Sequence, residues 1–117
     1  MNKVFVYGTL IQGAVLTHRL PGYMMFRVRG QHFDFPYIQP YPWDDSLPSV
    51  YGTIIDVTDE QLVEMDKYEG VERFLYRRVN TLAYPINEIA DGTPVQVYVG
   101  GPALVNEPIP SGVWTTR

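Results

Sequence analysis

The sequence predicts one α+β domain, either an antiparallel sheet with a helix or a small barrel with peripheral helices. A chain of 117 residues is close to the size at which one hydrophobic core is complete, so residues 1–117 are expected to form a single domain. Nine Tyr, ten Pro and ten Gly favour short strands joined by tight turns. The order along the chain, which is strand, loop, strands, one helix and strands again, indicates the α+β class.

The first third of the chain is expected to be mostly extended. A buried strand is predicted at Lys3–Tyr7, where β-branched and aromatic residues run up to Gly8. A weakly helical pattern follows over Gln12–Leu20 and ends at a Pro-Gly pair. Residues Tyr23–Phe35 alternate apolar with basic side chains, which is typical of a two-faced strand.

The segment Phe35–Pro48 is expected to be a long irregular loop. It contains four prolines and three further aromatic residues, and proline lacks the N–H that a central strand needs. Long loops in compact domains often form binding rims, so this segment is a candidate wall of a pocket. Packing of its prolines and aromatic rings over a sheet edge is an equally good interpretation.

One helix is predicted after a strand at Ser49–Val57. Thr58 and Gln61 have the spacing of a capping box, and Gly70 stands where a helix stop is expected. The positions of Leu62, Met65 and Glu69 are spaced by three and then four residues. They therefore fall on one helical face.

Two further strands and an irregular tail complete the prediction. The strands are expected at Phe74–Tyr84 and Val95–Val99, with a turn at Asp91-Gly92 between them. The tail contains Pro108 and Pro110 and is expected to be mostly irregular.

Composition excludes several classes of function. Nine Lys plus Arg against 13 Asp plus Glu give a net charge of −4, which is the wrong sign for a nucleic-acid-binding protein. The absence of Cys removes disulfides, thiolate nucleophiles and thiolate-bound metals. The short apolar N-terminus resembles neither a signal peptide nor a membrane span, so we expect a soluble, cytoplasmic protein with no membrane partner.

The sequence predicts neither a metal site nor a cofactor. Only His18 and His32 supply imidazoles, and their separation matches no local metal-binding pattern. Each is expected to be a surface or half-buried polar residue. Gly100-Gly101 follows a strand but lacks the Lys-Ser/Thr ending of a phosphate-binding loop.

Glu69 is the first candidate for chemistry. A carboxylate at the end of an apolar helical stripe would be partly desolvated, and desolvation raises its pKa toward the range useful for proton transfer. Alternatively, Glu69 lies in water beyond the last helical turn. Glu72 could play the same part, whereas the neighbouring Arg73, Arg77 and Arg78 are typical of a solvated strand face with cross-strand partners.

The second candidate is the sequence Tyr7-Gly8-Thr9-Leu10. A strand that ends in Gly lets the backbone turn with positive φ and point successive N–H groups into one concavity, which can hold a carboxylate. A plain turn is the alternative interpretation.

Taken together, these features resemble the gamma-glutamyl cyclotransferase-like, or AIG2-like, family, and the compact length resembles its small gammaglutamylamine cyclotransferase branch. The resemblance spans nearly the whole chain. It lies in the motifs Val4-Phe5-Val6-Tyr7-Gly8-Thr9-Leu10, Val50-Tyr51-Gly52-Thr53-Ile54, Met65-Asp66-Lys67-Tyr68-Glu69-Gly70, Tyr76-Arg77-Arg78-Val79 and Ser111-Gly112-Val113-Trp114.

The resemblance implies a fold, a substrate and site residues. The fold is a small mixed β-barrel of about five to seven strands with one or two flanking helices. Tyr7, Gly8, Thr9 and Leu10 would bind the glutamyl part of a small-molecule gamma-glutamyl substrate, and Glu69 would be the general acid and base. The segment 35–48 departs from the family pattern, and the sequence predicts no oligomeric state.

The implied reaction needs neither a metal nor a cofactor. In a gamma-glutamyl amine or peptide, the α-amine can attack its own γ-carbonyl and close a five-membered ring, which gives 5-oxoproline and a free amine. One carboxylate between the two nitrogens can take the proton from the first and give it to the second.

Two other functions remain as hypotheses. The same fold could be a non-catalytic module that binds a small metabolite or partner, an idea that rests on the unusual 35–48 segment. A barrel that stacks single-stranded nucleic acid on its many Tyr is disfavoured by the net charge of −4.

Overall fold

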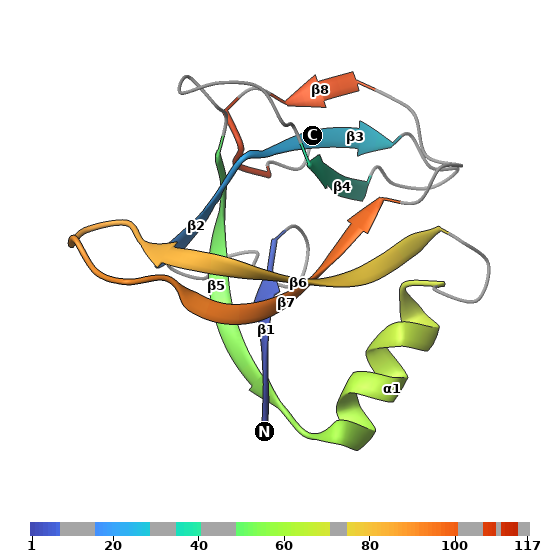
Figure 1. Ribbon diagram of the computed structural model, residues 1–117. Helices are drawn as coiled ribbons and strands as arrows, with labels where there is room; N and C mark the ends of the chain where they lie inside the picture. Colours follow the sequence, from blue (N-terminus) through green and yellow to red (C-terminus); the bar gives the residue numbers. More distant parts are fainter. Residues whose placement is uncertain are drawn as a thin grey trace.

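The protein forms eight strands and one helix within the residues that its computed structural model describes, which are 1–7, 16–28, 35–40, 49–70, 75–100, 107–109 and 111–114 (Figure 1). The elements are β1 (Asn2–Val6), β2 (His18–Pro21), β3 (Tyr23–Val28), β4 (Phe35–Pro40), β5 (Ser49–Val57), α1 (Asp59–Tyr68), β6 (Tyr76–Pro85), β7 (Thr93–Gly100) and β8 (Glu107–Ile109).

Five strands close into a barrel in the order β1-β5-β2-β6-β7. All pairs in the barrel are antiparallel except β1 with β7, which are parallel, so the barrel is mixed. The other three strands form a separate sheet in the order β4-β3-β8, which lies above one end of the barrel, while α1 lies beside the opposite part (Figure 1). The predicted fold, a small mixed barrel with a flanking helix, is confirmed.

The core consists of two buried clusters, because successive side chains of a barrel strand point to opposite sides. In β1, Phe5 packs in one buried cluster with Val97 of β7 and Val50 of β5. Val4 and Val6 point to the other side and pack with Leu62 of α1. Because neighbouring residues of a strand face opposite sides, one short strand contributes to both clusters and fixes α1 against the barrel wall.

Most elements predicted from local patterns are confirmed. The first strand is shifted by one residue, the strand at Ser49–Val57 has the predicted bounds, and strands are present at Tyr76–Pro85 and Thr93–Gly100. Phe74, where the third of these strands was expected to begin, lies outside the described residues.

The predicted helix at Gln12–Leu20 is wrong at its C-terminal end. His18, Arg19 and Leu20 belong to β2, which pairs with both β5 and β6. Leu20 is fully buried, so closing the barrel determines its conformation more strongly than the weak helical spacing does. Residues 12–15 lie outside the described part of the chain.

The predicted loop at Phe35–Pro48 is also wrong in its first part, because Phe35–Pro40 forms β4. This strand lies at the edge of the sheet β4-β3-β8, where Pro36 and Pro40 are tolerated because an edge strand pairs on one side only. Pro108 is tolerated in β8 for the same reason, because β8 is the other edge strand. The tail was expected to be irregular, and β8 is a short strand within it. Residues 29–34 and 41–48 are not among the described residues, and β3 accounts for the first half of the extended segment predicted at Tyr23–Phe35.

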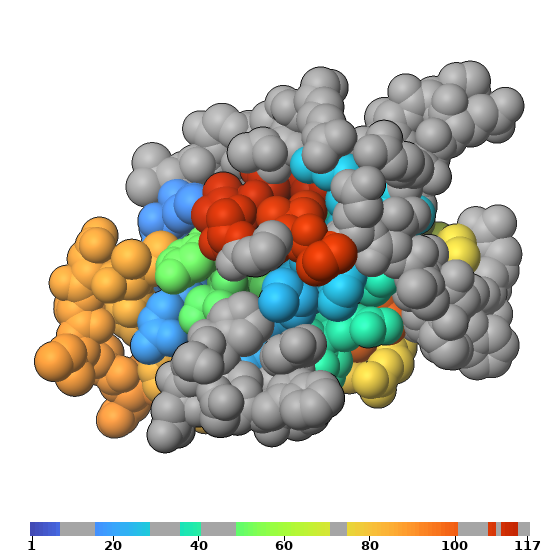
Figure 2. All heavy atoms as spheres, turned by 90° about the horizontal axis from the view of Figure 1, so that it is seen from above, coloured from blue at the N-terminus to red at the C-terminus, as the bar shows by residue number. Residues whose placement is uncertain are grey.

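The described C-terminal residues lie over the first strands of the chain. Seen from above, the red segment that includes 107–109 and 111–114 lies at the surface beside β3 and the start of β5 (Figure 2). The carbonyl of Gly112 accepts a hydrogen bond of 2.9 Å from the N–H of Tyr51, and the Trp114 ring contacts the buried Arg27 guanidinium at 4.4 Å. Within the described part of the chain, α1 is too short and too polar to be a membrane-spanning helix.

Candidate functional site

The capping of α1 determines where Glu69 lies. The Thr58 side chain accepts a hydrogen bond of 3.1 Å from the Gln61 N–H, and the Thr58 N–H donates to Gln61 Oε1 at 2.8 Å. This predicted capping box starts the helix, and Gly70 with φ +68° stops it. Glu69 is the last residue before this stop, and its N–H donates to the Met65 carbonyl at 2.9 Å.

The Glu69 side chain is half-buried at the end of the apolar face of α1. Leu62, two turns earlier on this face, is buried, and Met65 packs against the same cluster. Burial raises the pKa of Glu69 from its ordinary value of 4.5 to about 7. The carboxyl group therefore exchanges its proton near neutral pH instead of staying ionised as a surface glutamate does.

Three tyrosines lie close enough to this carboxyl group to feel its charge. They are Tyr7 after β1, Tyr76 in β6 and Tyr98 in β7. Burial is the main cause that raises the pKa of each phenol, and the negative charge of Glu69 raises all three further. The hydroxyl groups therefore stay protonated at neutral pH and donate to other acceptors. Tyr7 donates to the Tyr98 carbonyl, Tyr76 to the Pro36 carbonyl at 2.6 Å, and Tyr98 to the Asp66 carboxylate.

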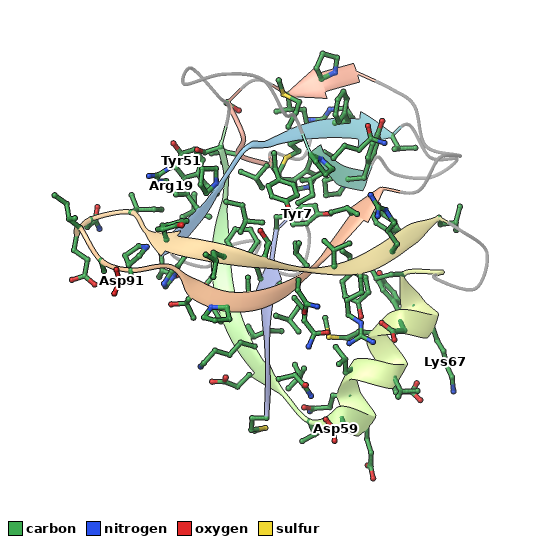
Figure 3. All side chains as sticks on the ribbon, viewed as in Figure 1. Tyr7, Arg19, Tyr51, Asp59, Lys67 and Asp91 are labelled. Carbon is green, nitrogen blue, oxygen red and sulfur yellow. The ribbon has the colours of Figure 1, made fainter. Side chains whose placement is uncertain are left out.

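Tyr7 connects the first strand to this group. Its hydroxyl donates a hydrogen bond to the Tyr98 carbonyl, and its label in Figure 3 marks it between the barrel and the upper sheet. The structure thus brings together Tyr7 and Glu69, which are 62 positions apart in the sequence. Gly8, Thr9 and Leu10, the other residues of the predicted loop, lie outside the described residues, as do Glu72 and Arg73.

Asp66 and Arg78 are site residues that the sequence did not single out for this role. Asp66 Oδ1 accepts a hydrogen bond of 2.7 Å from the Tyr98 hydroxyl, and Asp66 Oδ2 accepts one of 3.1 Å from Arg78. The predicted solvated face is thus only partly correct, because Arg77 is exposed whereas Arg78 is held between strand and helix. The position of Asp66, one helical turn before Glu69, was the available signal.

No metal site is found among the described residues, where no three His, Cys, Asp or Glu side chains gather. His18 is half-buried and its Nδ1 lies 2.8 Å from the Thr17 hydroxyl, as expected of a polar surface residue. His32 falls outside the described residues.

The structure is a small mixed barrel with a half-buried glutamate at the end of its flanking helix. Comparison of the sequence with known families identifies the family of the chain. The sequence matches the model of the gamma-glutamyl cyclotransferase, AIG2-like family over residues 4–116, so the chain belongs to this family. No curated protein matches the sequence significantly.

Solved structures share the fold. A gamma-glutamyl cyclotransferase superimposes with a TM-score of 0.66 at 17% identity, over 91% of this chain and 68% of that one. A protein from Arabidopsis thaliana gives a TM-score of 0.63 at 25% identity, over 85% of this chain and 68% of its own. An uncharacterised protein from Pyrococcus horikoshii gives 0.65 at 16% identity, over 97% of this chain and 89% of its own. The similarity to the first and third of these supports the fold alone.

Proposed function

We propose that the protein is a gamma-glutamyl cyclotransferase-type enzyme that converts the glutamyl part of a gamma-glutamyl amine or peptide to 5-oxoproline and releases the free amine. The observation that carries this proposal is Glu69, which has a pKa of about 7 and lies among neutral phenols at a helix end. Membership of the gamma-glutamyl cyclotransferase family supports the same reaction.

In the proposed mechanism, Glu69 moves one proton between two nitrogens of the substrate. The α-amine attacks the γ-carbonyl carbon, and the Glu69 carboxylate accepts the proton that the α-nitrogen loses. The resulting carboxylic acid then donates this proton to the leaving nitrogen as the C–N bond breaks. A group with a pKa near the working pH can do both steps, because neither protonation state is strongly favoured.

The rest of the proposed site orients the substrate. Tyr7-Gly8-Thr9-Leu10 would bind the glutamyl part, as the family motif implies, with Tyr7 next to Glu69. Holding the α-amine against its own γ-carbonyl can lower the activation free energy by up to about 7–11 kcal/mol, because the nucleophile is already tethered.

A panel of gamma-glutamyl compounds tests the proposal. Lysine-linked, polyamine-linked and glutathione members are incubated with the protein, and 5-oxoproline is measured by chromatography. Release of 5-oxoproline from at least one member by the wild-type protein, and not by Glu69→Gln, is the expected result. A compound that raises Tm without being consumed over hours would instead support a binding module.

A further inference from the structure

Asp66 fixes the last turn of α1 to two barrel strands. Both of its carboxylate oxygens are engaged: Oδ1 by the Tyr98 hydroxyl at 2.7 Å and Oδ2 by Arg78 at 3.1 Å. Arg78 Nε also lies 3.1 Å from Asp66 Oδ1, so the two side chains form an ion pair. Because Glu69 follows Asp66 by three residues, the two side chains are neighbours on one face of the helix end.

Tyr98 links this anchor to the other half of the candidate site. Its side-chain hydroxyl reaches Asp66 on α1, and its backbone carbonyl accepts the hydrogen bond of Tyr7. One residue of β7 therefore holds both the helix that carries Glu69 and the residue that precedes the predicted glycine turn.

Arg78 neutralises the charge of Asp66, one helical turn before Glu69. Its guanidinium reaches Asp66 with two nitrogens and donates with the third to Gln96. The two side chains of the ion pair are 29% and 27% exposed, so water screens the pair only in part. Lys67, the residue after Asp66, points away from the barrel (Figure 3), and its Nζ lies 3.6 Å from Glu64 Oε1.

The titratable and charged groups near Glu69 come from three strands and from α1. The charge of Glu69 raises the pKa of Tyr7 at the end of β1, Tyr76 in β6 and Tyr98 in β7. Asp66 lies one helical turn before Glu69 on α1, and Arg78 of β6 contacts Asp66. Among these, Asp66 and Arg78 are the two that carry charge at neutral pH, and their charges are opposite.

We propose that Asp66 and Arg78 act as a positioning pair for Glu69. The pair holds the end of α1 against the barrel, and its two opposite charges cancel one helical turn from the reacting carboxyl group. The inference rests on the proposed function, since positioning matters only if Glu69 transfers a proton. The electrostatic part can nevertheless be measured without any substrate.

The first experiment measures the pKa of Glu69 by NMR titration of glutamate side-chain carboxyl carbons. Asp66→Asn leaves the Arg78 charge unpaired and is expected to lower the Glu69 pKa by about 0.5 unit or more, whereas Arg78→Gln leaves the Asp66 charge unpaired and is expected to raise it by a similar amount. The double variant is expected to return close to the wild-type pKa. Shifts of the same sign, or none, would overturn the pairing.

The second experiment follows kcat against pH with a substrate from the panel. The rise of kcat on the acid side is expected to shift in the same directions as the NMR values. Tyr98→Phe removes the hydrogen bond to Asp66 without changing a charge. It is expected to lower kcat about 3- to 10-fold, with neither KM nor the midpoint of the pH profile changed.

A matched control and a folding check complete the design. Asp56→Asn also neutralises an aspartate in an ion pair, at 3.0 Å from Lys3, but on β5 near the start of α1. It should leave kcat and the Glu69 pKa unchanged. If either Asp66→Asn or Arg78→Gln fails to fold, the sign of the Glu69 pKa shift in the other variant decides. If both fail to fold, an unchanged kcat in Tyr98→Phe refutes the positioning role.

These outcomes are separate from those that test the proposed function. A wild-type protein that releases no 5-oxoproline refutes the function, while the NMR shifts still decide whether Asp66 and Arg78 form a balanced pair beside Glu69. Conversely, normal 5-oxoproline release with no opposed pKa shifts refutes the pair and leaves the function standing.

Discussion

Two glutamates, Glu64 within α1 and Glu69 at its C-cap, show how position determines chemistry. The Glu64 side chain is 75% exposed and lies 3.6 Å from Lys67, as in an ordinary surface ion pair. Glu69 is half-buried among three tyrosines, and burial raises its pKa to about 7. The two side chains are chemically identical and five residues apart, so it is the packing of the helix end against the barrel that makes one of them a candidate acid and base.

Replacing each glutamate in turn gives the largest expected effect. Glu69→Gln keeps the shape but cannot take a proton, so kcat for 5-oxoproline release is expected to fall about 10²- to 10⁴-fold. Glu64→Gln is the matched control and should leave kcat within the error of the assay. Equal rates for the two variants would mean that Glu69 takes no part in the reaction.

Gly70 tests whether the helix stop is needed to hold Glu69. Its φ of +68° disfavours a side chain, and a Cβ at this position would lie 2.8 Å from Leu75 Cδ1. Gly70→Ala is therefore expected to lower the free energy of unfolding by about 1–3 kcal/mol and also to lower kcat, because the end of α1 must shift.

Gly22→Ala provides the control for backbone strain alone. Gly22 has φ +83° in the turn between β2 and β3. Its substitution should lower the free energy of unfolding, measured in urea, while kcat stays unchanged. If Gly70→Ala loses stability but keeps full kcat, the helix stop does not position Glu69.

The raised pKa of Glu69 predicts a dependence of stability on pH. The folded protein holds this proton up to about pH 7, whereas the unfolded chain releases it near 4.5. The contribution of Glu69 to stability is thus fully present below pH 4.5 and is lost as the pH rises through 7. After allowance for partial exposure, this loss should amount to about 1–3 kcal/mol.

Urea unfolding of wild type and Glu69→Gln at pH 4.5 and pH 8 measures this loss. Gln carries no proton to lose, so the variant should gain stability relative to wild type between the two pH values. Its advantage at pH 8 would show that the wild-type protein keeps a destabilising carboxylate in its site. Parallel changes in both proteins would exclude a shifted Glu69 pKa.

Local signals predicted the helix and placed Glu69 on the same face as Leu62 and Met65. The side chains of Thr58 and Gln61 reach each other's backbone, and Gly70 needs no partner to adopt positive φ, so these features are readable from neighbours in sequence. The strand at Ser49–Val57 is similarly clear from its residue types. Each of these predictions depends on interactions over a few residues.

Long-range pairing explains what the sequence did not reveal. The six residues of β4 form a strand only because β3 supplies its single partner, which leaves Pro36 and Pro40 at an edge. Likewise, nothing within the sequence neighbourhood of Arg78 indicates that Asp66 and Tyr98 lie against it. Barrel closure creates both arrangements, and single-sequence patterns carry little information about it.

Thr58→Ala gives the smallest effect and tests the opposite end of α1. Losing the N-cap hydrogen bond to the Gln61 N–H should cost about 1 kcal/mol in the free energy of unfolding. Asn2 Nδ2 still donates to Asp59 at 2.8 Å, so the start of α1 stays tied to β1. The pH midpoint of kcat should therefore not move, because Asp66, two turns from Thr58, is bonded independently to β6 and β7. A midpoint shifted by Thr58→Ala would mean that α1 moves as a rigid rod and that its C-terminal contacts do not fix Glu69 independently.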